Sequence, residues 1–158
     1  MDDSSFFVPP PEASTRLPFL QLVRVPKGGF IRLVILSSDV LGVRTHRVDG
    51  KPFLCPGGTC PIEGCPKTGR WQGYVEAIAV NHPKRIMFEL TAEAYHHVRC
   101  ISVENSLQLR GLDLMFEREG KSRNATISVQ HMDTVRDVAS LGRERDLRPY
   151  VLRLYKVR

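Results

Sequence analysis

One segment, residues 49–69, limits what this chain can fold into more than any other. It contains five glycines and four prolines, and too few apolar side chains to form a core of its own. Three of the four cysteines of the chain lie in it, with four residues between neighbours: Cys55, Cys60 and Cys65. A proline follows each of these cysteines, which favours tight turns that direct the three thiols to one point. Something other than hydrophobic packing must therefore hold this segment, the cysteine loop, in place.

A metal ion would provide that constraint. Zn²⁺ takes four ligands in a tetrahedron, and three thiolates with one imidazole form a common structural set. His46 lies shortly before the cysteine loop, and we expect it to be the fourth ligand; Cys100 is its main rival, and His96 and His97 are weaker ones. The predicted zinc ligands are His46, Cys55, Cys60 and Cys65.

The cysteines have two other interpretations, a disulfide pair or three unrelated thiols. Disulfides are disfavoured in the cytosol, and three clustered cysteines cannot all pair with one another. With four protein ligands no coordination position stays open for a substrate, so we expect a structural metal rather than a catalytic one. Glu63 is the only acid in the loop after its first cysteine, and it lies in no recognised catalytic motif.

The length and the N-terminus narrow the class of protein. The 158 residues suffice for one domain with a core and are too few for two comfortable ones. No run approaches the roughly 18 apolar residues that a membrane span needs. Asp2 and Asp3 stand where a signal peptide carries positive charge, and no apolar stretch follows them. We therefore expect a cytoplasmic protein without membrane contact.

Composition divides the chain into three parts. Residues 1–27 contain several prolines among small and polar residues, and we expect them to form an extended or flexible arm. A β-rich domain is predicted over residues 28–130, and its zinc-binding stretch spans 46–69. Residues 131–158 form a tail.

Alternation of apolar and polar residues places the secondary structure within these parts. Thr91 is a suitable N-cap with acid in the following turn, so a short helix is expected to begin there and to end near residues 98–99. In the tail we expect a helical turn or two over 133–141 and an extended segment at 150–155. The predicted strands of the β-rich domain are 30–36, a second one begun at 43–48 and resumed at 71–80, then 85–90, 108–119 and 125–130.

This order of three strands, a short helix and two strands resembles that of OB-fold single-stranded nucleic-acid-binding proteins. The resemblance covers about residues 28–130 and rests on element order and basic loops. It implies a mainly β fold: a single OB-like five-stranded barrel with one short helix between strands three and four. It also implies an oligonucleotide site on the face of strands two and three. The loops between strands one and two and between strands four and five would border that site.

Basic residues are in excess, and the net charge is +6. The first 15 residues contain three acids and no base, so 23 bases face 14 acids in the remainder. Such an excess favours a polyanionic partner, because clustered Lys and Arg release phosphate counterions, although a solvated surface can simply be basic. Trp71 and Tyr74 are candidate stacking platforms that fall on opposite faces of a regular strand, and Trp71 could instead close the core. The predicted nucleic-acid-binding residues are Arg44, Arg47, Lys67, Arg70, Trp71, Tyr74, Lys84, Arg85, Lys121 and Arg123.

Together these features predict a non-enzymatic zinc protein that binds nucleic acid, single-stranded DNA or RNA ahead of duplex. The alternative is an adaptor that docks other proteins through the zinc loop, the N-terminal arm or the C-terminal tail. An enzyme is the third interpretation. A cysteine with a histidine could form a nucleophile and base, but these cysteines are better explained as ligands, and no phosphate loop or serine elbow is present.

Overall fold

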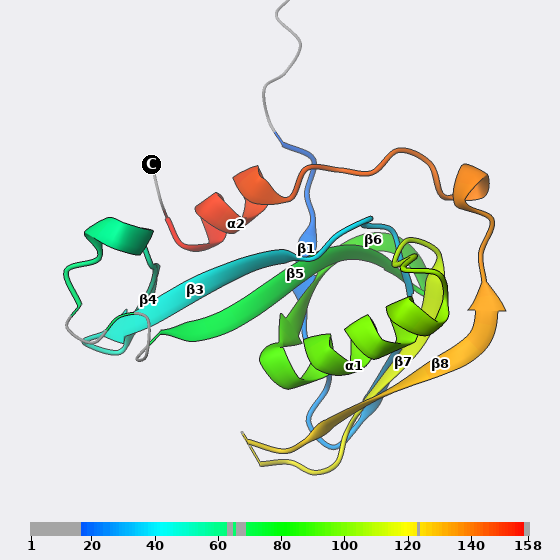
Figure 1. Cartoon of the computed structure of the whole chain (residues 1–158), viewed down its shortest axis with the longest axis horizontal. Helices are drawn as coiled ribbons and strands as arrows, with labels where there is room; N and C mark the ends of the chain where they lie inside the picture. Colours follow the sequence, from blue (N-terminus) through cyan, green and yellow to red (C-terminus); the bar gives the residue numbers. More distant parts are fainter. Residues whose placement is uncertain (1–16, 63–64, 66–68, 123, 157–158) are drawn as a thin grey trace, which may run out of the picture.

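One β-sheet and two α-helices make up the described part of the chain (Figure 1). The computed structural model describes residues 17–62, 65, 69–122 and 124–156. The helices are α1 (Ala92–Glu104) and α2 (Arg148–Leu154), with two short 3-10 helices, η2 (Gly57–Thr59) and η3 (Val138–Leu141). The strands are β1 (Gln21–Val23), β2 (Phe30–Ile35), β3 (Leu41–Val48), β4 (Lys51–Leu54), β5 (Arg70–Ala79), β6 (His82–Thr91), β7 (Leu112–Arg118) and β8 (Ile127–Val135).

The main path of the sheet is β1-β6-β5-β2-β7-β8, and only the β1–β6 pair on it is parallel. β2, β5 and β6 pair in succession, and β7 returns after α1 to lie beside β2. This is the spatial order of a Greek key, in which the fourth strand lies beside the first. The β3–β4 hairpin extends from β5 and carries the cysteine loop at its far end, on the left of Figure 1.

The mainly β fold is confirmed, whereas a five-stranded barrel is not. Among the described residues no ladder joins β8 to β6 or β1, so the sheet is not closed. The sequence predicts neither β1 nor β4. β1 belongs to the expected arm and pairs with residues 86–88 of β6, while residues 1–16 of that arm lie outside the described part. β4 lies inside the cysteine loop and contains Pro52, which is tolerated there because β4 is an edge strand.

Helix α1 begins where the sequence predicts and ends later. The Thr91 hydroxyl accepts a hydrogen bond from the Ala94 amide at 3.2 Å, which confirms Thr91 as the N-cap. The sequence predicts an end near residues 98–99, but Ile101, one turn beyond Val98, also packs against the core. The Asn105 side chain donates to the Ile101 carbonyl at 2.8 Å where the helix ends.

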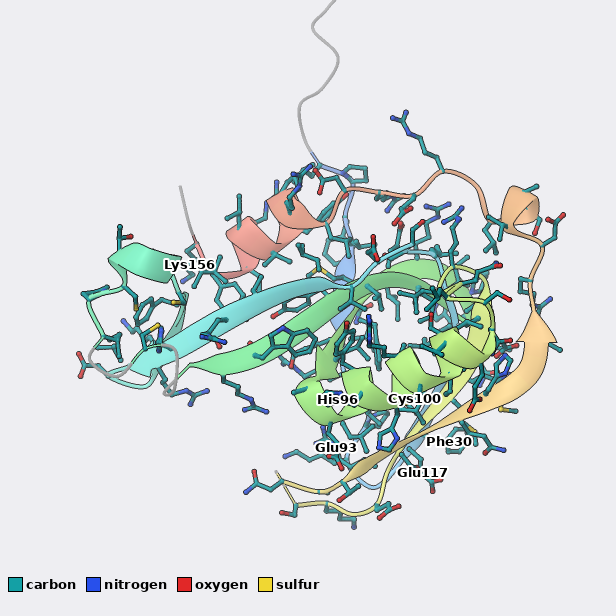
Figure 2. All side chains as sticks on the ribbon, viewed as in Figure 1. Phe30, Glu93, His96, Cys100, Glu117 and Lys156 are labelled. Carbon is teal, nitrogen blue, oxygen red and sulfur yellow. The ribbon has the colours of Figure 1, made fainter. Side chains whose placement is uncertain are left out.

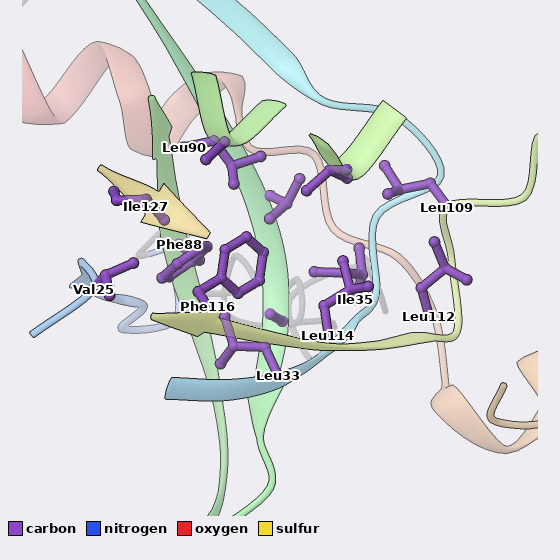
Figure 3. Close-up of a cluster of buried hydrophobic side chains, with 14 of the residues drawn as sticks. Val25, Leu33, Ile35, Phe88, Leu90, Leu109, Leu112, Leu114, Phe116 and Ile127 are labelled. Atoms are coloured by element: carbon purple, nitrogen blue, oxygen red, sulfur yellow. The ribbon is translucent and has the colours of Figure 1, made fainter. Parts of the chain in front are cut away.

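The main core lies on the face of the sheet that α1 covers (Figure 3). β6 alternates as predicted, so Ile86, Phe88 and Leu90 point into this core. The Phe88 and Phe116 rings are 4.8 Å apart, and burial of each such side chain stabilises the fold by roughly 1.5–3 kcal/mol. Other members of the core are Val25, Leu33, Ile35, Val75, Ala77, Ala94, Val98, Leu109, Leu112, Leu114 and Ile127.

The opposite face of the sheet is partly covered by α2, which lies above β3 and β5 in Figure 1. Tyr74 and Met87 are buried there against Leu20 and against Tyr150 and Val151 of the helix. The extended segment predicted at 150–155 is therefore wrong. Of the helical turn or two predicted at 133–141, one turn is present as η3, whereas residues 133–135 continue β8. Pro149 at the first turn and apolar residues at positions 147, 150 and 151 favour the helix instead.

A buried carboxylate ties the segment before α2 to the sheet. Glu76 of β5 is fully buried, and its Oε1 accepts a hydrogen bond from Arg85 at 3.1 Å. Its Oε2 accepts one from the Arg145 amide at 3.2 Å. Arg85 also donates to the carbonyl oxygens of Leu141 and Arg143, at 2.9 and 2.8 Å. These bonds fix the path of the chain from η3 to α2.

Candidate metal centre

The β3–β4 hairpin places the four predicted ligands. His46 lies on β3 opposite Phe53 of β4, and the two rings are 5.6 Å apart. His46 is only 4% exposed, so its imidazole is held in one position. The Cys55 amide donates to the Arg44 carbonyl at 2.8 Å, which fixes the chain immediately after β4. The Cys60 amide donates to the Gly57 carbonyl at 3.0 Å and closes the η2 turn.

These turns bring one imidazole and three thiols together. The Cys60 sulfur lies 3.4 Å from Nε2 of His46, and the Cys55 and Cys65 sulfurs are also 3.4 Å apart. All four ligand atoms lie within 4.8 Å of one another. A separation of 3.4 Å is too long for a disulfide bond, and the four cysteines are free thiols. The arrangement can hold a metal ion.

Hydrogen bonds make the thiols of the cluster unequal. The pKa of Cys55 is lowered to about 7, mainly by a hydrogen bond from the Gly57 amide and to a lesser extent by hydrogen bonds with the neighbouring thiols and His46. The hydrogen bond with Cys55, reinforced by burial, raises the pKa of Cys65 to about 11. A negative charge on one sulfur thus opposes ionisation of its neighbour. Because metal binding requires thiolates, a bound cation would remove this mutual repulsion.

Cys100 does not belong to the cluster. It is exposed on α1, as is His96 (Figure 2), and this helix lies away from the cysteine loop. Neither residue nor His97 is among the described residues whose ligand atoms approach one another closely enough to bind a metal. The structure therefore favours His46 over Cys100, His96 and His97 as the fourth ligand.

Three predicted basic residues lie on the ribbon formed by β3 and β5, beside the metal centre. Arg44 pairs with Trp71 in register and Thr45 pairs with Arg70, while Arg47 lies near the end of β3. Neighbouring strand residues point to opposite faces, so Arg44 and Trp71 share one face. Arg47, Thr45 and Arg70 share the other. In the described part of the chain no ion pair involves Arg44, Arg47 or Arg70.

The face with Arg47 and Arg70 is hollowed into a cavity of about 600 Å³, here called the arginine pocket. Asn124 of the β7–β8 loop contributes to its lining, and no acidic residue does. Arg24 forms a bidentate ion pair with Glu89 at 2.9 Å. The Tyr155 hydroxyl donates to Oε1 of Gln72 at 2.7 Å. The residues that give the pocket its character are Arg24, Thr45, Arg47, Arg70, Gln72 and Tyr155.

Sequence reasoning misses Arg24, Gln72 and Tyr155. They lie just after β1, near the start of β5 and just after α2, and only the pairing of β1 with β6 and the docking of α2 bring them together. No local pattern marks Arg24 or Tyr155, whereas Gln72 shares a strand face with the predicted Arg70.

Other predicted nucleic-acid-binding residues lie elsewhere. Tyr74 is fully buried under α2 and offers no ring face for stacking, and Arg85 is engaged by Glu76. Lys84 is exposed near the β5–β6 turn, at the end of β5 away from the metal centre. Lys121 lies in the β7–β8 loop close to Gly28. Two predicted residues lie outside the described part of the chain, Lys67 and Arg123.

Comparison with known proteins adds no relative: no family model matches the chain, and neither a curated protein nor a solved structure is significantly similar to it. Among the described residues, no helix has the length and apolar character needed to span a bilayer. The function must therefore be argued from the site.

Proposed function

We propose that this chain is a zinc-containing protein that binds single-stranded nucleic acid through the arginine pocket, with zinc in a structural role. The metal assignment follows from the ligand set, because three thiolates and an imidazole suit Zn²⁺ and disfavour Mg²⁺ or Ca²⁺. With Zn–S bonds of about 2.3 Å, the sulfurs of a tetrahedral site lie about 3.8 Å apart. The Cys55–Cys65 sulfur separation of 3.4 Å and the 4.8 Å limit for all four ligand atoms bracket that value.

The fold supports the position of the nucleic-acid site. The Greek-key order of β2, β5, β6 and β7, with α1 before β7, is that of an opened OB-like barrel. In that correspondence β5 and β6 are strands two and three. The β3–β4 hairpin enlarges the loop after strand one, and the β7–β8 loop follows strand four. The arginine pocket lies on β5 between these two loops, where OB barrels bind oligonucleotides.

The arginine pocket is the observation that carries the proposal. Arg47 and Arg70 have no ion-pair partner among the described residues, and the pocket lining contains no acid, so phosphate is the favoured ligand. Helix α2 covers the neighbouring part of β5 and β6, where Tyr74 and Met87 are buried. We therefore expect a short bound strand, because among the described residues α2 leaves open the end of this face nearest the metal centre.

Fluorescence anisotropy with a labelled single-stranded oligonucleotide tests the proposal. The double variant Arg47→Gln with Arg70→Gln should weaken binding by at least about tenfold at low salt, with the melting temperature nearly unchanged. Its salt dependence should flatten by about 0.7 counterions for each lost phosphate contact. The matched control is Lys84→Gln with Arg99→Gln, which removes two exposed charges outside the pocket. Equal loss in both double variants would mean diffuse attraction, and no binding by the wild type would favour the adaptor interpretation.

A further inference from the structure

A second cavity, of about 550 Å³, lies between the β3–β5 ribbon and the cysteine loop. It is on the face of the ribbon that carries Arg44 and Trp71, and so on the opposite side from the arginine pocket. We call it the tryptophan cavity. Its characteristic lining residues are Arg44, Cys55, Cys60, Ile62, Cys65 and Trp71.

Trp71 forms a fixed aromatic wall of this cavity. Gly42 and Gly73 are paired in register, and a Cβ at either position would come within 2.8 and 2.6 Å of indole atoms. The absence of side chains there lets the indole lie directly on the ribbon. Tyr95 of α1 supports it at a ring distance of 4.9 Å. Trp71 is therefore braced by the ribbon and by Tyr95, and the part of it that lines the cavity needs little reordering to contact a ligand.

Arg44 supplies a charge to the same cavity. Its aliphatic stem lies over Gly69, where an added Cβ would collide with it. No acid neutralises Arg44 among the described residues. A guanidinium that has no acidic partner among the described residues, beside an indole and Ile62, suits a ligand that has a flat ring and an anionic group.

We propose that the tryptophan cavity binds a nucleotide, with its base packed against the part of Trp71 that lines the cavity and its phosphate held by Arg44. The ligand is either a free mononucleotide or an unstacked nucleotide of a strand, and both present the same chemistry. The ligand class follows from the walls of this cavity, so it does not depend on the arginine pocket binding a strand. The three cysteines of the candidate metal site also line this cavity. Nucleotide binding therefore requires the cysteine loop to be held in place by the metal.

Intrinsic fluorescence gives a specific readout, because Trp71 is the only tryptophan of the chain. The zinc-loaded full-length protein is titrated with AMP, adenosine and inorganic phosphate. Light absorption by the added ligand is corrected with a parallel titration of free tryptophan. AMP should quench Trp71 saturably, adenosine about tenfold more weakly because it lacks the charge-assisted bond to Arg44, and phosphate not at all. Arg44→Gln should bring AMP to the affinity of adenosine, and Arg44→Lys should recover part of the difference. Removal of zinc by a chelator should abolish quenching.

Titration with an oligonucleotide separates the two sources of the nucleotide. If the ligand is part of a strand, the oligonucleotide quenches Trp71 more strongly than AMP, and Arg47→Gln with Arg70→Gln weakens this quenching. If it is a free nucleotide, AMP quenches more strongly and that double variant leaves the effect unchanged. Quenching by neither ligand, quenching that is unaltered in a folded Arg44→Gln variant, or quenching that persists without zinc would each overturn the inference. The anisotropy result for the arginine pocket is independent of all three.

Discussion

His46 illustrates how one residue can join two regions of the molecule. It lies on a strand that pairs with β5, so its backbone belongs to the sheet, while its side chain belongs to the cysteine cluster. The Cys60 sulfur 3.4 Å away has no such support from the sheet, because it follows the η2 turn. A metal ion bound by both His46 and Cys60 would therefore hold the cysteine loop to the sheet.

Metal content tests this arrangement residue by residue. Purified wild-type protein should contain about one zinc per chain, and both Cys60→Ser and His46→Ala should lower that content, because each removes one of four ligands. Cys100→Ser is the matched control, since Cys100 is an exposed thiol outside the cluster, and it should leave the zinc content unchanged. Measurement is by metal analysis after purification without chelator. Loss of zinc in Cys100→Ser with retention in His46→Ala would reverse the ligand assignment.

A second residue-scale prediction concerns Asp113 of β7, which is fully buried. Burial alone would raise the pKa of Asp113, but hydrogen bonds from Arg32 at 2.8 Å and Thr134 at 2.9 Å outweigh it and lower that pKa. The carboxylate therefore stabilises the fold above its unfolded-state pKa, and the contribution disappears as pH falls through the lower folded-state value. Asp113→Asn should cost roughly 1–3 kcal/mol of unfolding free energy at neutral pH.

Urea denaturation of wild type and Asp113→Asn at pH 7 and near pH 3 measures the effect. The difference between the two proteins should shrink at the acid end, because the Asp113 carboxyl of the unfolded wild type then binds a proton that the folded state resists. Glu117→Gln on the same strand is the control, since Glu117 is exposed, and it should change stability by less than about 0.5 kcal/mol. A difference that is the same at both pH values would mean that Asp113 acts through shape and not through charge.

At the scale of elements, helix α2 decides which part of the sheet remains open. It covers Tyr74 on β5 and Met87 on β6, and the Tyr155 hydroxyl after the helix lies 2.7 Å from that of Tyr74. The arginine pocket, which Tyr155 also lines, lies on the same face of the sheet beside the helix. The helix thus both closes the second hydrophobic cluster and forms one wall of the pocket.

Truncation of a side chain tests how firmly α2 is docked. Tyr150 is 8% exposed and packs in the cluster with Tyr74, so Tyr150→Ala should cost roughly 3–5 kcal/mol, the usual loss for a large buried aromatic side chain. Leu152→Ala is the matched control on the same helix, because Leu152 is 43% exposed, and it should change stability little. Both unfolding free energies come from urea titrations. If both variants lost a similarly small amount of unfolding free energy, α2 would be only weakly docked on the sheet.

For the whole molecule, the sequence predicts what local chemistry determines. The strand at 85–90 and the Thr91 cap are correctly predicted, and the four expected ligands do lie close together, because alternation, capping and thiol spacing act over short distances. The tail is not, since Tyr and Val at 150–151 fit a strand as well as a helix, and only docking onto the sheet selects the helix. The engagement of Arg85 by Glu76 is likewise visible only once the strands are paired.

The placement of the metal centre has a consequence for how this protein would respond to its surroundings. None of the buried residues of the main core comes from β3, β4 or the cysteine loop, so the core does not need the metal in order to form. Both cavities do need the ribbon and its loop, which supply Arg47 and Pro52 to one and three cysteines to the other. If the cluster holds zinc and the cavities bind the ligands proposed above, zinc scarcity would leave a folded protein with impaired binding, and the metal supply would set how much of it is competent to bind.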